Sequence, residues 1–231
     1  MADIREFRFP DARAAADALA QAIADRLAAA IAERATATVA LSGGRSPAAV
    51  FEALHDVALP WDKVVITQVD ERWVPMNHPD SNSQLIRCHL LQGFAAAARF
   101  VPMKNDASTA RAGQPECEAA LHALPLPFDV MLLGMGEDGH TASLFPEAAE
   151  LQEGLTTRAL TLALTPPAAP HERMSLSARG LLESRVLILQ IGGAAKEAVY
   201  RAALAQGPVE DMPIRAILRQ TKVPVEVWIS E

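Results

Sequence analysis

Residues 38–57 read TVALSGGRSPAAVFEALHDV, and this stretch predicts the fold. Its first four residues are apolar or β-branched and indicate a short buried strand. A turn from Ser42 to Pro47 follows, in which Ser46 suits a helix N-cap and Pro47 suits the first helical position. A helix is therefore expected at about 47–57. A buried strand that passes through a glycine turn directly into a helix is typical of an α/β fold.

The sequence on both sides of this unit repeats the alternation of helix and strand. Apolar residues recur every four positions at Leu19, Ile23, Leu27 and Ile31, which predicts a helix before the unit. Further strands are expected at 63–69, 99–102, 128–133, 158–164, 173–177, 185–191 and 225–229. Further helices are expected near 82–92, 115–123, 194–206 and 213–220. This alternation predicts one α/β domain (residues 1–231) with a largely parallel sheet covered on both faces.

Composition limits the class of protein. The chain has 231 residues, of which 50% are hydrophobic and 21% are charged, so it can form a sizeable core. The formal net charge is −7, and the acidic balance argues against a general binder of nucleic acid or of membrane surfaces. A small anion in one pocket is still compatible with this charge, because a few local cations suffice to bind it.

Cysteine usage and the first residues indicate the compartment. Cys88 and Cys117 form no disulfide framework and have no metal-ligand spacing, which favours a reducing environment. The stretch MADIREFRFP at 1–10 lacks the apolar segment of a signal peptide, and no segment approaches the length of a membrane span. A soluble cytoplasmic protein is expected. No feature specifies an oligomer, and a monomer is favoured.

Polar clusters follow three of the expected strands, at 38–41, 63–69 and 128–133. Ligands of parallel α/β sheets bind beyond the carboxyl ends of the strands, so the three clusters are expected to line one crevice. The segment 42–47 offers bare backbone N–H groups at a helix start, which attract phosphate. The alternative is an ordinary turn that needs glycine. The segment is not a Walker A loop, because no Gly-Lys-Ser/Thr follows.

Two cations lie where an anion site would use them. Arg173 precedes an expected strand, and Lys196 lies in the first turn of the helix after Gly192 and Gly193. A cation at a helix N-terminus is unfavourable for the helix alone, and a bound anion would remove that conflict. The alternative for Lys196 is a surface lysine.

The segment after strand 128–133 contains a G-x-G-x-x-G pattern, at Gly134, Gly136 and Gly139. A dinucleotide site is rejected, because Glu137 and Asp138 occupy the approach of a pyrophosphate and no continuous helix follows. His140, flanked by Asp138, suits a general base near neutral pH. The alternative is a histidine that is hydrogen-bonded in a tight turn.

Asp70, Glu71 and Arg72 end the strand at 63–69, where they could orient a water molecule or neutralise an anion. The alternative is a solvated strand end in which Glu71 balances Arg72. Among the other histidines, His78 and His171 lie on loops that could approach the site. No Ser-His-Asp arrangement and no metal site is predicted, because Asp138 and His140 supply at most two ligands.

Several stretches resemble the 6-phosphogluconolactonases, which share a superfamily with the glucosamine-6-phosphate deaminases. The most specific stretch is FDVMLLGMGEDGHTASLFP at 128–146. The others, in the family's order, are LSGGRSP at 41–47, QVDERWVP at 68–75 with DSN at 80–82, RMSLS at 173–177 and GGAAK at 192–196. Ser46 stands where threonine is frequent, and RMSLS replaces a more usual RITLT, but both keep hydroxyl groups.

The resemblance implies hydrolysis of 6-phospho-D-glucono-1,5-lactone to 6-phosphogluconate, the second step of the oxidative pentose phosphate pathway. It implies a three-layer α/β/α sandwich with a Rossmann-like, mostly parallel sheet, and neither a metal nor an organic cofactor. His140 matches the general base, and Asp70 and Arg72 match the loop at the reacting end. The phosphate side is matched by Gly43, Gly44, Arg173 and Lys196, and Arg45 in the same turn is a further candidate.

The chemistry of a lactone agrees with these residues. A lactone is an activated ester, so no covalent nucleophile is required. His140 would take a proton from the attacking water and return one to the ring oxygen, while Arg72 or backbone N–H groups stabilise the oxyanion. Either Asp138 or Asp70 could hold the imidazole. The phosphate would position the lactone through binding energy remote from C1.

Two other functions are weighed against this one. Amino-sugar-phosphate deaminase-isomerases resemble DGHIAFNEP after the strand, with an acid near the histidine. Here Ser143, Leu144 and Phe145 replace that stretch, and the acid Glu147 comes only after the proline. A non-catalytic sugar-phosphate sensor would need a DNA-binding or partner domain, for which the chain shows no room.

Overall fold

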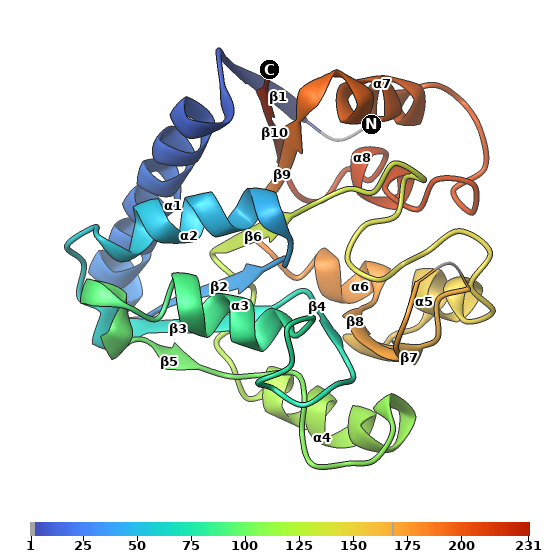
Figure 1. Cartoon of the computed structure of the whole chain (residues 1–231), viewed down its shortest axis with the longest axis horizontal. Helices are drawn as coiled ribbons and strands as arrows, with labels where there is room; N and C mark the ends of the chain where they lie inside the picture. The colour runs from blue at the N-terminus through green and yellow to red at the C-terminus, as the bar shows by residue number, and fades with distance from the viewer. Residues whose placement is uncertain (1–2, 168) are drawn as a thin grey trace.

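Seven parallel strands form one sheet in the computed structural model, which describes residues 3–167 and 169–231 (Figure 1). In spatial order they are β1 (Ile4–Phe9), β10 (Val225–Ser230), β9 (Leu187–Gly192), β6 (Val130–Leu133), β2 (Ala37–Leu41), β3 (Val64–Gln68) and β5 (Arg99–Phe100). Every neighbouring pair is parallel, as the alternating pattern predicted. The carboxyl ends of the strands therefore lie at one edge.

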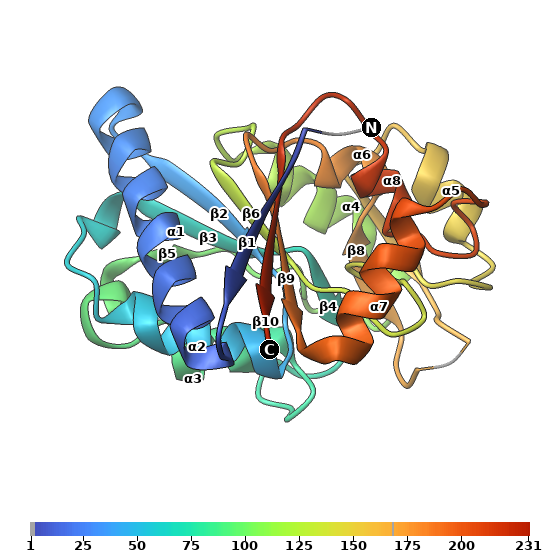
Figure 2. The same ribbon diagram turned by 90° about the horizontal axis from the view of Figure 1, so that it is seen from above.

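Helices cover both faces of this sheet, which gives three layers (Figure 2). One face carries α1 (Ala12–Arg34), α2 (Arg45–His55), α3 (Asn82–His89) and the short 3₁₀ helices η1 (Trp61–Lys63) and η2 (Gly93–Ala97). The other face carries α4 (Ala110–His122), α5 (Leu151–Thr156), α6 (Ala178–Leu181), α7 (Gly193–Leu204) and α8 (Arg215–Leu218). The expected α/β/α sandwich is confirmed.

The strand β6 shows why the middle layer reads as continuous hydrophobic sequence. Val130 and Leu132 pack into the core beside α1 and α2, whereas Met131 and Leu133 pack into the core on the opposite face. Successive side chains of a strand point to opposite faces, so a strand buried on both faces needs apolar residues at every position.

A second, smaller sheet lies apart from the parallel one. It consists of β4 (Asp70–Arg72), β8 (Arg173–Leu176) and β7 (Thr161–Leu164), all antiparallel. The strands at 158–164 and 173–177 were expected, but the residues after 69 were expected to form a loop. Asp70 and Glu71 are instead buried, and β4 begins directly where β3 ends. The pattern of apolar residues did not indicate this strand, because all the side chains of β4 are polar.

Three other boundaries differ from the prediction. The helix α2 begins at Arg45 with Gly44 as its N-cap, so Ser46 is inside the helix and does not cap it. The helix α4 is capped by the side chain of Thr109 and runs through Pro115, the residue at which the sequence predicts its start. The edge strand β1 was missed because charged residues alternate with its apolar ones.

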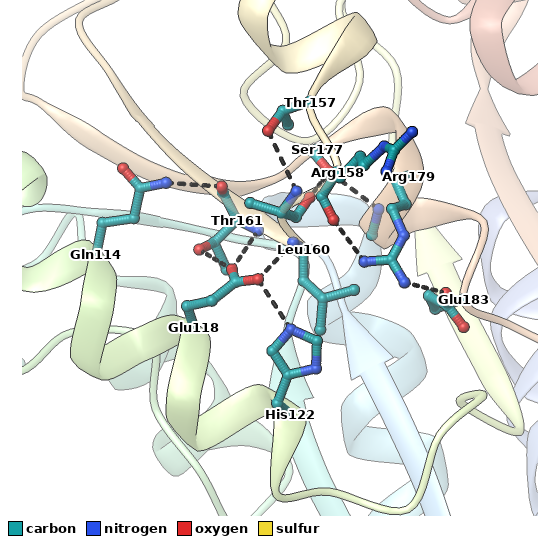
Figure 3. Close-up of polar contacts among 12 residues, drawn as sticks. Gln114, Glu118, His122, Thr157, Arg158, Leu160, Thr161, Ser177, Arg179 and Glu183 are labelled. Carbon is teal, nitrogen blue, oxygen red and sulfur yellow. Dashed lines mark hydrogen bonds and ion pairs between the residues drawn. The ribbon is translucent and has the colours of Figure 1, made fainter.

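Glu118 of α4 fastens the small sheet to the rest of the molecule (Figure 3). Its carboxylate accepts hydrogen bonds from the backbone N–H groups of Leu160 and Thr161, at 2.8 Å each, and from the Thr161 hydroxyl at 2.5 Å. Burial acts to raise the pKa of Glu118, but these hydrogen bonds outweigh it and lower the pKa below its usual value. Gln114 adds a bond from its amide to the Thr161 carbonyl, at 2.8 Å. The start of β7 is thus held by α4.

The structure shows the state of the two cysteines and the character of the helices. Cys88 is exposed and Cys117 is buried, and both are free. Among residues 3–167 and 169–231, no helix combines the length and the apolar character that crossing a membrane requires.

Candidate active site

A pocket of about 540 Å³ lies at the carboxyl edge of the parallel sheet, between that sheet and the smaller one. All three polar clusters that follow the predicted strands reach it, as does α7. The lining residues are Ser42, Gly43, Gly44, Asp70, Arg72, Asn82, Gly134, Met135, Gly136, Glu137, Asp138, His140, Ala142, Phe145, Ala169, Arg173 and Lys196. The predicted crevice is therefore present.

The turn after β2 brings backbone to the pocket and leaves little room for a side chain. A Cβ atom on Gly43 would lie 1.8 Å from Oδ1 of Asn82, so this position needs glycine. Gly44 caps α2 and also lines the pocket. Arg45, in contrast, is exposed on the first turn of α2 and is not among the lining residues. Of the candidates in this turn, only the two glycines reach the cavity.

The glycine-rich segment after β6 folds back on itself and holds His140. The N–H of Gly136 donates to the His140 carbonyl at 2.9 Å, and the N–H of Gly139 donates to the Gly136 carbonyl at 3.1 Å. Gly139 has φ +79°, a conformation that other residues rarely adopt. No helix opens here, since the next one is α5, which agrees with the rejection of a dinucleotide site.

His140 and Asp138 form a close pair within this turn. Nδ1 of His140 lies 2.6 Å from Oδ1 of Asp138, and the same carboxylate oxygen accepts the His140 backbone N–H at 3.1 Å. In a neutral imidazole, donation of Nδ1–H to Asp138 leaves the lone pair on Nε2. Phe145 stacks on the ring at 4.1 Å between centroids. The imidazole is thus fixed on one face and at one nitrogen.

Asp70 has different partners. Its side chain is buried and accepts the Ser143 hydroxyl at 2.6 Å and the Asn82 amide at 3.2 Å. The sequence left open whether Asp70 or Asp138 contacts His140, and the geometry gives the contact to Asp138. Asp70 instead joins β4 to the segment that follows His140.

The alternative in which Glu71 balances Arg72 at a solvated strand end is wrong. Its buried carboxylate accepts hydrogen bonds from the hydroxyls of Ser81 and Ser83, from the Gln68 amide and from three backbone N–H groups, those of residues 72, 82 and 83. The Arg72 guanidinium donates instead to the Asp80 carbonyl at 2.7 Å. Glu71 therefore fixes the start of α3, including Asn82, beside the pocket.

Arg72 and Arg173 lie opposite each other in the small sheet. Arg173 is only 5% exposed, and its guanidinium donates to the Pro170 carbonyl at 3.1 Å. Nε of Arg173 and Nε of Arg72 are buried without a hydrogen-bond partner among the described residues. Burial, and next the charge of Arg72, lower the pKa of Arg173. Two neighbouring cations in a pocket attract an anion.

Lys196 adds a third positive charge to the pocket. It lies in the first turn of α7, as expected, and its side chain lines the cavity. A cation in that position opposes the helix dipole, so a negative ligand between Lys196 and the arginines would relieve both the helix and the arginine pair.

Three residues of the site were not singled out from the sequence. Phe145 stacks on His140 and also lies beneath the Arg173 guanidinium, 6.0 Å from the ring centroid. Ser143 and Asn82 hold Asp70. Phe145 and Ser143 belong to the stretch 128–146 that carried the resemblance. The motif therefore pointed to these two residues, but it did not indicate what either side chain contacts.

The sequence and the fold are both similar to those of known proteins. Residues 10–227 match the family described as glucosamine-6-phosphate isomerases/6-phosphogluconolactonase. A 6-phosphogluconolactonase of Pseudomonas putida is 44% identical over 230 residues, which cover 98% of this chain and 93% of that protein. The crystal structure of a 6-phosphogluconolactonase from Shewanella baltica is 43% identical, with a TM-score of 0.96 and coverage of 100% of this chain and 98% of the other.

A more distant structure shows what the fold alone conveys. A monomeric glucosamine-6-phosphate deaminase aligns with a TM-score of 0.82 over 98% of this chain and 97% of its own, at 19% identity. Enzymes of both kinds thus share this fold, and the distinction between them depends on the residues in the pocket.

Proposed function

The chain belongs to the family of glucosamine-6-phosphate isomerases and 6-phosphogluconolactonases, and on this premise we propose that it hydrolyses 6-phospho-D-glucono-1,5-lactone to 6-phospho-D-gluconate. The observation that carries the proposal is one pocket that holds both the Asp138–His140 pair and Arg173, which is buried and forms no salt bridge among the described residues. The pair can activate water, and the arginine can bind a phosphate. The two free cysteines suit a reducing compartment, and we place the reaction in the cytoplasm.

The proposed chemistry begins at Nε2 of His140. With Nδ1–H donated to Asp138, Nε2 accepts a proton from water as the water attacks C1 of the lactone. The ring oxygen leaves when C1–O breaks, and the imidazolium returns the proton to that oxygen. Asp138 orients the ring and stabilises its transient positive charge. Histidine, water and lactone suffice for these steps.

Arg72 is proposed as the stabiliser of the oxyanion. Its guanidinium is held at one end by the Asp80 carbonyl, and its buried Nε has no partner among the described residues. A donor fixed in advance beside a developing negative charge lowers the barrier, because little reorganisation is needed during the reaction.

The phosphate is proposed to lie against Arg173, Lys196 and the backbone of Gly43 and Gly44. All four line the pocket, and the N–H groups at the start of α2 favour a negative group. A planar guanidinium can contact two phosphate oxygens together, which would fix the orientation of the lactone as well as its affinity.

The experiment compares three substrates on the same purified protein. Rapid hydrolysis of 6-phosphogluconolactone is expected, together with much slower hydrolysis of the unphosphorylated gluconolactone, because the latter lacks the group that Arg173 and Lys196 bind. Release of ammonia from glucosamine 6-phosphate is expected to stay at background. Absence of lactone hydrolysis above the uncatalysed rate would refute the proposal. Tight binding of the sugar phosphate without turnover would identify a sensor instead.

The position of Glu147 argues against the deaminase-isomerase. This residue, the first acid after the His140 turn, is exposed and is not among the lining residues of the pocket. Among the described residues that line the pocket, the acids are Asp70, Glu137 and Asp138, and two of these are already engaged with Ser143 and His140. The acid that a sugar-ring opening would need beside the histidine is therefore not supplied by Glu147.

A further inference from the structure

A cluster of three ligand-bearing side chains lies outside the pocket lining, close to its small-sheet side. His78, Asp80 and His171 each bring one nitrogen or oxygen atom into a group whose members are all within 4.8 Å of one another. Oδ2 of Asp80 is 3.1 Å from Nε2 of His171 and 3.8 Å from Nδ1 of His78. The two imidazoles meet edge to face, with 5.6 Å between their centroids.

The small sheet brings these residues together. The strands β4 and β8 are antiparallel, and Arg72 at the end of β4 is opposite Arg173 at the start of β8. The chain that leaves β4 and the chain that enters β8 therefore run beside each other, and the Trp73 N–H donates to the Glu172 carbonyl at 2.7 Å. His78 and Asp80 lie on the first of these segments and His171 lies on the second. Ninety-one residues separate Asp80 from His171, so spacing in the sequence gave no sign of the cluster.

The Asp80 carboxylate is open to a cation. Arg72 donates to the backbone carbonyl of Asp80 rather than to its carboxylate. The two histidines and this carboxylate are each 30–54% exposed, which leaves them accessible from solvent.

The donor set and the spacing fit zinc. Two imidazole nitrogens and one carboxylate oxygen are ligands that Zn²⁺ accepts, at about 2.1 Å each, and ligand atoms of a tetrahedral site then lie about 3.4 Å apart. The distances of 3.1 Å and 3.8 Å at Asp80 bracket that separation. Nδ1 of His78 now accepts the Asp80 backbone N–H at 3.1 Å. An ion between the three groups would replace this hydrogen bond and the proton that His171 shares with Asp80, and water would complete its coordination.

We propose that His78, Asp80 and His171 form a binding site for one Zn²⁺ ion that links the segment after β4 to the segment before β8. The ion is not part of the hydrolytic chemistry, since none of its three ligands lines the pocket. The ion links the segment that follows Arg72 to the segment that precedes Arg173. It thereby restricts the backbone next to both arginines.

The test is calorimetric titration of the EDTA-dialysed full chain with ZnCl₂ alone. One ion per chain is expected to bind, and His78→Ala and His171→Ala are each expected to weaken binding at least tenfold. His89→Ala is the matched control, because His89 also faces a carboxylate, Glu52 at 2.8 Å, and has similar exposure. It should bind zinc as the unaltered protein does. Circular dichroism establishes that each variant is folded.

Hydrogen exchange supplies a second readout that does not depend on affinity. Zinc is expected to slow amide exchange in residues 74–81 of the unaltered protein and to leave the same residues unchanged in His171→Ala. No saturable binding by the unaltered protein would overturn the proposal, as would binding by both histidine variants that is as tight as that of the unaltered protein. Loss of binding in His140→Ala, with retention in the other two variants, would place the ion at Asp138 and also overturn it.

Discussion

The two sheets contribute to the pocket in different ways. The pocket residues of the parallel sheet lie beyond the ends of its strands: Gly43 and His140 are on turns, and Lys196 is on α7. The pocket residues of the antiparallel sheet, in contrast, belong to the strands themselves: they are Asp70, Arg72 and Arg173. Side chains on the turns can change without disturbing a ladder of backbone hydrogen bonds, whereas those in the small sheet are part of its packing.

Because of this difference, we expect variants in the two regions to affect stability and catalysis differently. His140 and Asp138 are partly exposed and contact mainly each other and Phe145. Asp70 and Arg173 are buried, and each is tied to neighbouring elements. Variants of His140 and Asp138 should therefore change the reaction rate alone. Variants in the small sheet should change the rate and the melting temperature together.

The largest effect is expected for His140→Ala. We expect kcat for the phosphorylated lactone to fall by roughly a hundredfold or more, because the group that takes the proton from water is gone. The melting temperature should stay within about one degree, since His140 makes one side-chain hydrogen bond on an exposed turn. His89→Ala, which removes another histidine–carboxylate pair, should leave kcat unchanged. A loss of less than a few-fold in His140→Ala would exclude it as the base.

Arg173→Met should change affinity and stability in opposite directions. Loss of a charge-assisted contact to phosphate should raise KM about tenfold to a hundredfold. The ligand-free variant should melt at a higher temperature, because burial and Arg72 both disfavour the charged form of Arg173 in the folded protein. Arg179→Met is the matched control, since Arg179 is surface-exposed and paired with Glu183 at 3.1 Å (Figure 3). A lower melting temperature for Arg173→Met would contradict this account.

The two aspartates offer a direct test of the difference between the sheets. We expect Asp138→Asn to lower kcat about tenfold without a change in melting temperature, because an amide no longer stabilises the imidazolium. Asp70→Asn should destabilise the protein by about 2 kcal/mol, because a buried amide would replace the acceptor of Ser143 and Asn82. Kinetics and thermal unfolding of both variants check this. Equal melting temperatures for the two variants would refute the separation.

The smallest effect on activity is expected for Glu118→Gln. The variant keeps the shape but loses the charge that accepts three hydrogen bonds at the start of β7 (Figure 3). We expect a loss of about 1 kcal/mol at neutral pH, at the low end for charged acceptors because Glu118 is partly exposed. Chemical denaturation measures this loss, and kcat should remain within a factor of two.

The pH dependence of that loss has a definite sign. The folded-state pKa of Glu118 lies below its usual value, so its contribution to stability is present above the unfolded-state pKa, about 4.3, and is lost as the pH falls through the folded-state pKa. The difference in stability between the unaltered protein and Glu118→Gln should therefore be largest near neutral pH and should shrink below about pH 4. A difference that grows in acid would show that the charge is not responsible.

Much of the parallel sheet could be predicted from the sequence for a simple physical reason. The strand β6 is buried at every position and therefore reads as an uninterrupted apolar run, and β9 begins with three buried apolar residues. The turn with His140 could be predicted because glycine and acidic residues stand out directly after such a run. The same reasoning failed for β1, whose charged residues face solvent at an edge of the sheet.

The small sheet could not be predicted in the same way. The strand β4 is three polar residues long, and Glu71 is buried only because six hydrogen bonds satisfy it, four of them from residues 81–83. Local pattern carries no information on such partners. The choice between Asp70 and Asp138 as the neighbour of His140 depended on the same tertiary contacts, and so did the exposure of Arg45.

The pairing of β1 with β10 has a consequence for how the chain folds on the ribosome. Among the described residues, β1 pairs with the single strand β10, which is synthesised long after it, and Phe7 and Phe9 stack on Trp228 of that late strand. The first strand to emerge therefore stays unpaired, with two aromatic rings uncovered, until nearly all of the described chain has been made. Folding of this edge therefore depends on contacts between segments that are far apart in the sequence, and a nascent chain that lacks β10 would leave the aromatic residues of β1 exposed.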